Sequence, residues 1–236
     1  MTAPRLSPPI NATTTGLAGR MIDKAMLLAW RTLTRLVRLL PERVAFGCAA
    51  AAADVCFAAL PSFRQPLEEE AVHLLRRAAP VDPARAKRLA RLALRSYFLR
   101  QVELVRWRDM TGDDFLRLVD VQGLEHLDAA LAQGRGVILL TAHYGSFLMG
   151  PIALGYRGYD VSQIIGPPKL HPRWTFQQEI HRYRQAVSAK FPLRFLVAAG
   201  SLKSVLRALG AGGAVVLAFD GREGAGWVEA DFLGHK

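Results

Sequence analysis

Cysteine is scarce in this sequence: only Cys48 and Cys56 are present, and both lie in an alanine-rich apolar stretch. Two cysteines placed in this way provide neither a disulfide framework nor a cysteine-based metal site. We therefore expect both to fill the core of a protein that works in a reducing compartment. No histidine pair or group of carboxylates has the spacing of metal ligands, so we expect no bound metal.

The sequence also lacks a long uninterrupted apolar run and a secretory signal. The best candidate for a membrane span, residues 44–60, consists largely of alanine and contains Asp54. A charge and weakly hydrophobic residues argue against a full span, so we predict a helix that packs inside the fold or dips into the bilayer. Residues 1–19 contain prolines, threonines and glycines without an apolar segment after a charged start. We interpret them as a disordered leader.

Acidic residues are outnumbered: 20 Asp and Glu stand against 31 Lys and Arg, giving a net charge of +11 and a pI near 10.3. At the same time 51% of the residues are hydrophobic, and the mean hydropathy is +0.14. A basic and apolar chain indicates an anionic partner, either nucleic acid or anionic lipid. No nucleic-acid-binding module with interleaved aromatic residues is recognisable, so a lipid surface fits better.

Residues 20–40 predict an amphipathic helix with a purely cationic polar face. Apolar residues recur at helical spacing, and no Asp or Glu occurs between Lys24 and Pro41. This composition is typical of a helix in a membrane interface, with Trp30 at headgroup depth. The alternative is an ordinary domain helix with a solvated charged face. The basic residues that we predict to face anionic lipid are Arg20, Lys24, Arg31, Arg35 and Arg38.

Further helices are expected over residues 67–79 and from the Asp82-Pro83 N-cap to about Trp107. From Val119 the pattern changes to short strands alternating with helices, which predicts a mostly parallel sheet flanked by helices. We thus expect a leader (1–19), a helical membrane-associated region (20–112) and an α/β domain (113–236). The predicted strands cover residues 119–122, 137–141, 159–165, 194–198, 214–219 and 228–232, and the predicted helices of this domain cover 124–132, 146–154, 174–190 and 202–209.

The most informative stretch is the apolar run at residues 137–141, which lies between Gly136 and Gly145 and predicts a buried strand. His143 follows just past its carboxyl end. In open α/β sheets ligands bind at that edge, so His143 is a candidate general base. The alternative is a core histidine held by one backbone hydrogen bond.

A second candidate site follows the predicted strand at residues 214–219. Its sequence is Asp220-Gly-Arg222-Glu223-Gly, and the guanidinium of Arg222 suits a lipid phosphate. The alternative is a plain glycine-rich turn. Lys169 and Arg173, in a proline-rich loop, would add positive potential at the same edge.

Several of these motifs together resemble the lipid A late acyltransferases, the lauroyl and myristoyl acyltransferases of Gram-negative bacteria, within the lysophospholipid acyltransferase superfamily. The matching stretches are residues 134–148, 202–213, 215–220 and Phe232-Leu-Gly234, and the resemblance covers roughly residues 20–236. It implies an enzyme on the cytoplasmic face of the bacterial inner membrane. Such an enzyme transfers a fatty acyl chain from an acyl-carrier protein or coenzyme A thioester to a hydroxyl of a membrane lipid, a lipid A precursor or a lysolipid, without a further cofactor.

The resemblance also assigns roles to residues. His143 matches the base of the family's H-x-x-x-x-D/E motif, but Leu148 stands where the acid is expected. Leucine cannot orient an imidazole. Loss of the orienting acid, if nothing replaced it, would lower the rate by orders of magnitude. Asp220, Glu223 and Asp160 are the carboxylates whose place at a strand end or in a loop could let one take over, and a backbone carbonyl could also orient the ring. The substrate-binding candidates are Gly145, Ser146, Lys169, Arg173 and Arg222.

Leu148 leaves an alternative open: a catalytically degenerate homologue that serves as a lipid-binding or accessory membrane protein. The resemblance further implies strands and helices beyond the Phe-Leu-Gly element, whereas this sequence ends at Lys236. We therefore expect a sheet edge that is unpaired or needs a partner.

Overall fold

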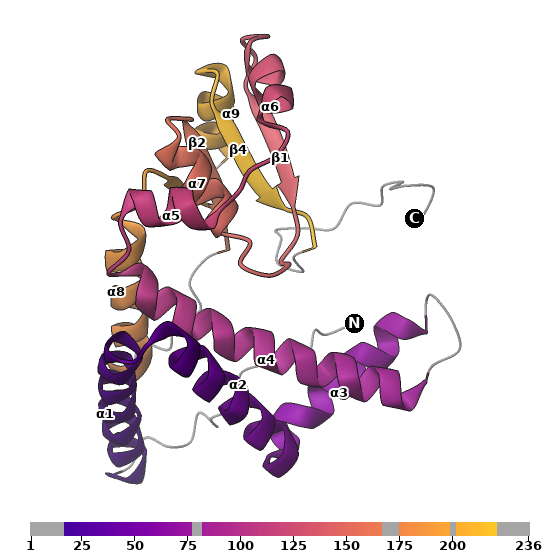
Figure 1. Cartoon of the computed structure of the whole chain (residues 1–236), viewed down its shortest axis with the longest axis vertical. Coiled ribbons are helices and arrows are strands. Elements are labelled where there is room, and N and C mark those ends of the chain that lie inside the picture. The colour runs from indigo at the N-terminus through magenta and orange to yellow at the C-terminus, as the bar shows by residue number, and fades with distance from the viewer. Residues whose placement is uncertain (1–16, 77–81, 167–174, 199–201, 221–236) are drawn as a thin grey trace. The chain divides into compact units, whose positions relative to one another are not determined.

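The computed structural model describes residues 17–76, 82–166, 175–198 and 202–220. The chain divides into two compact units, one formed by residues 1–109 and 170–187 and the other by residues 110–169 and 188–236 (Figure 1). The first unit is helical and the second contains a sheet. The predicted leader up to residue 16 and the predicted strand at 228–232 lie outside the described residues.

The helical unit is formed by α1 (Leu17–Leu39), α2 (Glu42–Ala59), α3 (Pro61–Leu75), α4 (Pro83–Trp107) and α8 (Thr175–Ser188). The predicted start of α4 is confirmed, because the Asp82 carboxylate accepts a hydrogen bond from the backbone N–H of Ala84 at 2.9 Å and Pro83 occupies the first turn. We predicted the 174–190 helix as part of the α/β domain, whereas α8 groups with the helical unit.

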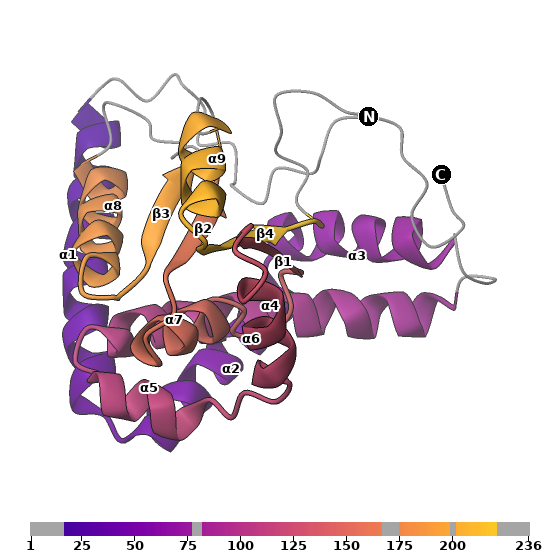
Figure 2. The same cartoon turned by 90° about the horizontal axis from the view of Figure 1, so that it is seen from above.

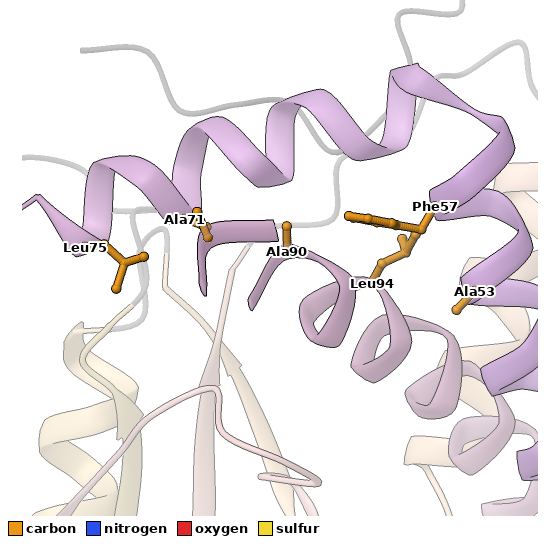
Figure 3. Close-up of a cluster of buried hydrophobic side chains, with 7 residues drawn as sticks. Ala53, Phe57, Ala71, Leu75, Ala90 and Leu94 are labelled. Carbon is orange, nitrogen blue, oxygen red and sulfur yellow. The ribbon is translucent and has the colours of Figure 1, made fainter. Parts of the chain in front are cut away.

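Small and apolar side chains hold α2, α3 and α4 together. Figure 3 shows Ala53 and Phe57 of α2, Ala71 of α3, and Ala90 and Leu94 of α4 gathered in one cluster. Alanines at the contacts allow the helix backbones to approach closely, and burying the larger side chains removes apolar surface from water. Our expectation that both cysteines fill the core is wrong for Cys48, which is exposed.

A carboxylate of α1 binds the N-terminus of α8. Asp23 accepts hydrogen bonds from the backbone N–H groups of Thr175 at 3.1 Å and Phe176 at 2.9 Å. These donors have no partner inside their own helix, and the helix dipole favours a negative charge there. Arg31 and Glu179 add an ion pair at 3.1 Å, and the two helices lie side by side (Figure 2).

The α/β unit contains α5 (Gly112–Leu118), α6 (Leu124–Leu131), α7 (Met149–Tyr156) and α9 (Leu202–Gly210). Its described residues form four strands, β1 (Val137–Thr141), β2 (Val161–Ile165), β3 (Arg194–Val197) and β4 (Ala214–Ala218). All the strand pairs are parallel, in the order β1-β4-β2-β3. The predicted parallel sheet flanked by helices is thereby confirmed.

The predicted strand at residues 119–122 is wrong: this segment follows α5 and pairs with no described strand. Its backbone is used differently, because the Val119 carbonyl accepts a hydrogen bond from Arg157 at 2.9 Å. Helix α5 was not predicted. It begins with a capping box formed by Thr111 and Asp114, and it buries Phe115 completely.

Candidate functional site

The register of the sheet brings His143 next to Asp220. Strands β1 and β4 are neighbours, with Thr141 opposite Ala218, so their carboxyl ends coincide. His143 and Asp220 each stand two residues beyond these ends. The pairing continues past the strands, because the Phe219 N–H donates to the Thr141 carbonyl at 3.0 Å. Two side chains 77 residues apart are thus fixed at one edge of the sheet.

Both oxygens of the Asp220 carboxylate are engaged by the same residue. Oδ1 lies 2.8 Å from Nδ1 of the His143 ring, and Oδ2 accepts the backbone N–H of His143 at 2.8 Å. Two contacts to one residue hold the carboxylate next to the imidazole. Because a carboxylate only accepts hydrogen bonds, Asp220 selects the tautomer of His143 with hydrogen on Nδ1, in which Nε2 carries a lone pair.

The protonation state of Asp220 follows from the same contacts. Burial raises the pKa of its carboxyl, but the hydrogen bonds from the His143 backbone and ring, together with the charge of the ring, outweigh burial and leave the pKa below its ordinary value. The carboxyl is therefore ionised at neutral pH. The His143 side chain is 46% exposed, so a substrate can reach it.

An aromatic side chain supports the histidine on another side. The rings of His143 and Phe147 meet edge to face with centroids 4.6 Å apart. This contact restricts rotation of the imidazole and keeps it at the mouth of a cavity.

The cavity has a volume of about 570 Å³ and opens at the carboxyl edge of the sheet. Its lining is mainly apolar, with contributions from Phe147 and Leu148 before α7 and from the ends of β2 and β4. Leu148, at the position where the family motif has its acid, is thus part of an apolar wall. The apolar side chains that line it are Phe147, Leu148, Ile164, Ile165, Ala198, Leu217 and Ala218.

Gln163 is a polar member of the lining that the sequence analysis missed. It is 1% exposed; its Nε2 donates to the Ile164 carbonyl at 3.0 Å, and its Oε1 accepts no hydrogen bond from the described residues. A glutamine within the apolar strand sequence Val-Ser-Gln-Ile-Ile was the available signal, since buried amides are uncommon.

Of the other residues predicted to bind substrate or to replace the acid, Gly145 and Ser146 lie in the described part of the chain, close to His143 in the sequence. Gly145 lies beside His143 with a φ of 55°, a left-handed conformation that favours glycine. Ser146 is half-buried, and its carbonyl accepts the N–H of Met149 at 2.8 Å as α7 begins. Lys169, Arg173, Arg222 and Glu223 lie outside the described residues.

Helix α1 carries three surfaces rather than two. Trp30 and Val37 face the interior of the helical unit, where the ring of Trp30 packs edge to face on Tyr183 at 5.9 Å. This contact partly buries Trp30, and its expected place at headgroup depth stays a prediction. A broad apolar face and the basic row remain exposed. The large side chains of the apolar face are Leu17, Met21, Ile22, Leu28, Leu33, Leu36 and Leu39.

Two of the five basic residues of α1 have partners within the helical unit. Arg31 pairs with Glu179 at 3.1 Å, and Arg38 pairs with Asp109 through two contacts of 2.6 and 2.7 Å. Their pairing leaves Arg20, Lys24 and Arg35, all exposed, as the remaining members of the row.

Within the described ranges, no single helix combines the length and the apolar composition of a membrane span, whereas α2 and α3, which meet at an angle of 90°, satisfy both criteria when taken together. In the same ranges no three His, Cys, Asp or Glu side chains are grouped so that they could hold a metal ion.

The fold and this site define a class of protein: an α/β protein with a histidine–carboxylate pair at the carboxyl edge of a parallel sheet, next to an apolar cavity. A neutral imidazole held in this way can take a proton from a hydroxyl. The model of the bacterial lipid A biosynthesis acyltransferase family matches residues 19–236, and the chain belongs to this family. It is therefore an acyltransferase of the lipid A type. Among the curated proteins with which it was compared, none matches the chain.

Proposed function

We propose that the protein transfers a fatty acyl chain from an acyl-carrier protein or coenzyme A thioester to a hydroxyl of a membrane lipid, a lipid A precursor or a lysolipid, with His143 as general base. The observation that carries this proposal is the contact of 2.8 Å between Nδ1 of His143 and Asp220 at the mouth of an apolar cavity. It supplies an oriented base next to a space suited to an acyl chain.

The reaction follows from this arrangement. Nε2 of His143 takes the proton of the acceptor hydroxyl while the hydroxyl oxygen attacks the thioester carbonyl. The tetrahedral intermediate collapses, the C–S bond breaks, and the imidazolium returns its proton to the leaving thiolate. Asp220 keeps hydrogen on Nδ1 and offsets the positive charge that forms on the ring.

Asp220 replaces the acid that the family motif places at position 148. A motif carboxylate and Asp220 would do the same physical work, because either accepts the Nδ1 hydrogen and offsets the imidazolium charge. With leucine at 148, the wall of the cavity remains apolar. We infer that the acyl chain of the donor lies against this wall, with its thioester carbonyl at His143.

The exposed apolar face of α1 would hold the enzyme at an anionic membrane surface, on the cytoplasmic side of the inner membrane. Apolar side chains would enter the headgroup region, and the exposed cations Arg20, Lys24 and Arg35 would lie over anionic lipid. Because α1 also packs in the core through Val37, point substitutions test this role better than deletion of the helix.

The catalytic proposal is tested by acyl transfer with purified protein in detergent, given an acyl thioester and a lipid A precursor or lysolipid. We expect His143→Ala to abolish turnover. His126→Ala is the matched control, because this histidine of α6 has a side chain 88% exposed and contacts only Glu125 weakly, at 3.9 Å. Equal activity of wild type and His143→Ala would eliminate His143 as the base. Lipid binding without any turnover in the wild type would instead favour the accessory role.

The membrane role is tested by sedimentation with vesicles containing phosphatidylglycerol. Leu28→Gln with Leu36→Gln should weaken binding about tenfold or more, because two large apolar side chains are lost from the contact. Leu89→Gln with Leu92→Gln changes two exposed leucines of α4 and should leave binding unchanged. The same loss in both double variants would show that α1 has no special part in attachment.

A further inference from the structure

A second cavity, of about 580 Å³, lies in the helical unit and is lined by α2, α3 and α4. The cavity at His143 has a mainly apolar lining, whereas basic side chains dominate the polar lining of this one. Arg64 comes from α3, and Lys87, Arg88 and Arg91 come from the first turns of α4. Side chains from separate helices that converge on one hollow make a defined anion site rather than a charged helix face.

Asp54 of α2, the one carboxylate among the described residues of this lining, does not cancel that charge. It accepts hydrogen bonds from Nε of Arg91 at 2.7 Å and Nε of Arg95 at 2.8 Å. The hydrogen bond from Arg91, followed by that from Arg95, holds the pKa of the Asp54 carboxyl far below its usual range. The carboxylate is thus shared by two guanidinium groups and fixes Arg91 at the wall of the cavity.

The other three cations of the lining have weaker contacts with carboxylates than Arg91 has. Arg64 approaches Glu68 only at 4.0 Å, and Lys87 and Arg88 are exposed on the side of α4 that lines the cavity. The floor includes Phe57, which is 5% exposed and apolar. Water is partly displaced over such a floor, which strengthens the attraction between these cations and a bound anion.

We propose that this cavity binds a phosphate group, carried either by a soluble phosphomonoester or by the headgroup of a membrane lipid. A single guanidinium fork satisfies a carboxylate, whereas a doubly charged phosphate with three oxygens suits several arginines together with a lysine. The lining offers three arginines and one lysine. The start of α4 at Pro83 adds the positive end of its helix dipole close to Lys87. The proposal goes beyond the acyl-transfer site, since it uses none of that site's residues.

The test compares two double variants of the full-length protein that each remove two positive charges. Lys87→Gln with Arg88→Gln changes the cavity, whereas Arg43→Gln with Arg85→Gln changes two exposed basic residues that do not line it. Inorganic phosphate and glycerol phosphate are titrated by calorimetry at constant ionic strength. Vesicles containing phosphatidic acid are compared with phosphatidylglycerol vesicles adjusted to equal surface charge. Circular dichroism checks that each variant is folded.

We expect saturable phosphate binding that weakens about tenfold or more in the cavity variant and changes little in the control variant. Binding of the soluble phosphates supports a soluble ligand, whereas a preference for phosphatidic acid vesicles alone, lost in the cavity variant, supports a lipid headgroup. An equal loss in the two variants, or no saturable binding to either source, would overturn the proposal. None of these readings depends on acyl transfer, so failure of the His143 mechanism would not affect them.

Discussion

Replacing Asp220 with asparagine tests the catalytic geometry most directly. The carboxylate gives one oxygen to Nδ1 and the other to the backbone N–H of His143, each at 2.8 Å. Asparagine has nearly the same shape but only one acceptor oxygen. If that oxygen keeps the backbone contact, the amide NH₂ faces Nδ1 and favours the tautomer with hydrogen on Nε2. The nitrogen that should accept the substrate proton is then already protonated.

We therefore expect Asp220→Asn to lower kcat by about 10²- to 10⁴-fold, the range that a misoriented or uncharged partner costs a histidine base. KM should change far less, because Asp220 acts through the ring rather than on the substrate. The assay is steady-state acyl transfer with a labelled thioester donor. Asp160→Asn is the matched control, since Asp160 lies at the opposite end of the sheet and makes an exposed ion pair with Arg194 at 2.5 Å. A kcat for Asp220→Asn close to that of the control would refute the assigned role of Asp220.

The pKa of Asp220 adds a second readout. Because the folded-state pKa lies below the ordinary value of about 3.9, ionised Asp220 stabilises the fold above that pH. This contribution is lost as the pH falls through the lower folded-state value. The free energy of unfolding should therefore fall with acidification more steeply in the wild type than in Asp220→Asn. Chemical denaturation at a series of acidic pH values measures the difference, and identical slopes would contradict the contacts to His143.

Three further predictions concern packing and caps. Gly155→Ala in α7 places a Cβ 2.2 Å from the Pro192 carbonyl oxygen and should lower the free energy of unfolding by about 3 kcal/mol. Gly150→Ala in the same helix is the control, because its Cβ meets nothing within 4 Å, and it should be neutral or stabilising. Thermal denaturation measures both. Asp23→Ala removes the carboxylate that accepts the first two N–H groups of α8 and should cost about 1 kcal/mol, seen as faster amide hydrogen exchange in α8. Gln163→Leu removes a buried oxygen that has no hydrogen-bond partner among the described residues, and it should stabilise the protein by about 1 kcal/mol in urea denaturation; a loss of stability would show that Oε1 has an essential partner.

The order of helices and strands could be predicted where local patterns were strong. The runs around Val137 and Val215 are apolar, short and bounded by glycine, and they form the expected strands. Helix α5 was not predicted because seven residues make only about two turns, too few for a clear helical period, so its capping box is the only local signal of its start. Val119 and its neighbours have strand-like side chains, but a strand needs a neighbour, and Arg157 uses the Val119 carbonyl instead.

The three surfaces of α1 show a different limit. Periodicity correctly separated its apolar and basic residues, but it could not tell which apolar residues face the protein. That choice is made by α8, which begins 152 residues after Asp23 and covers Trp30 with Tyr183. The pairing of Arg31 with Glu179 has the same origin. A helix taken alone therefore overstates the number of cations available to a membrane.

The candidate site depended on the same kind of long-range information. Sequence position put His143 and Asp220 each after a strand, but only the strand order makes those strands neighbours, since β4 inserts between β1 and β2. A motif of fixed spacing looks for the acid five residues after the histidine and finds Leu148. The imidazole responds to the distance and charge of its partner and not to the partner's position in the chain. A carboxylate from the adjacent strand can therefore take the place of the motif acid, and it frees position 148 for the apolar wall of the cavity.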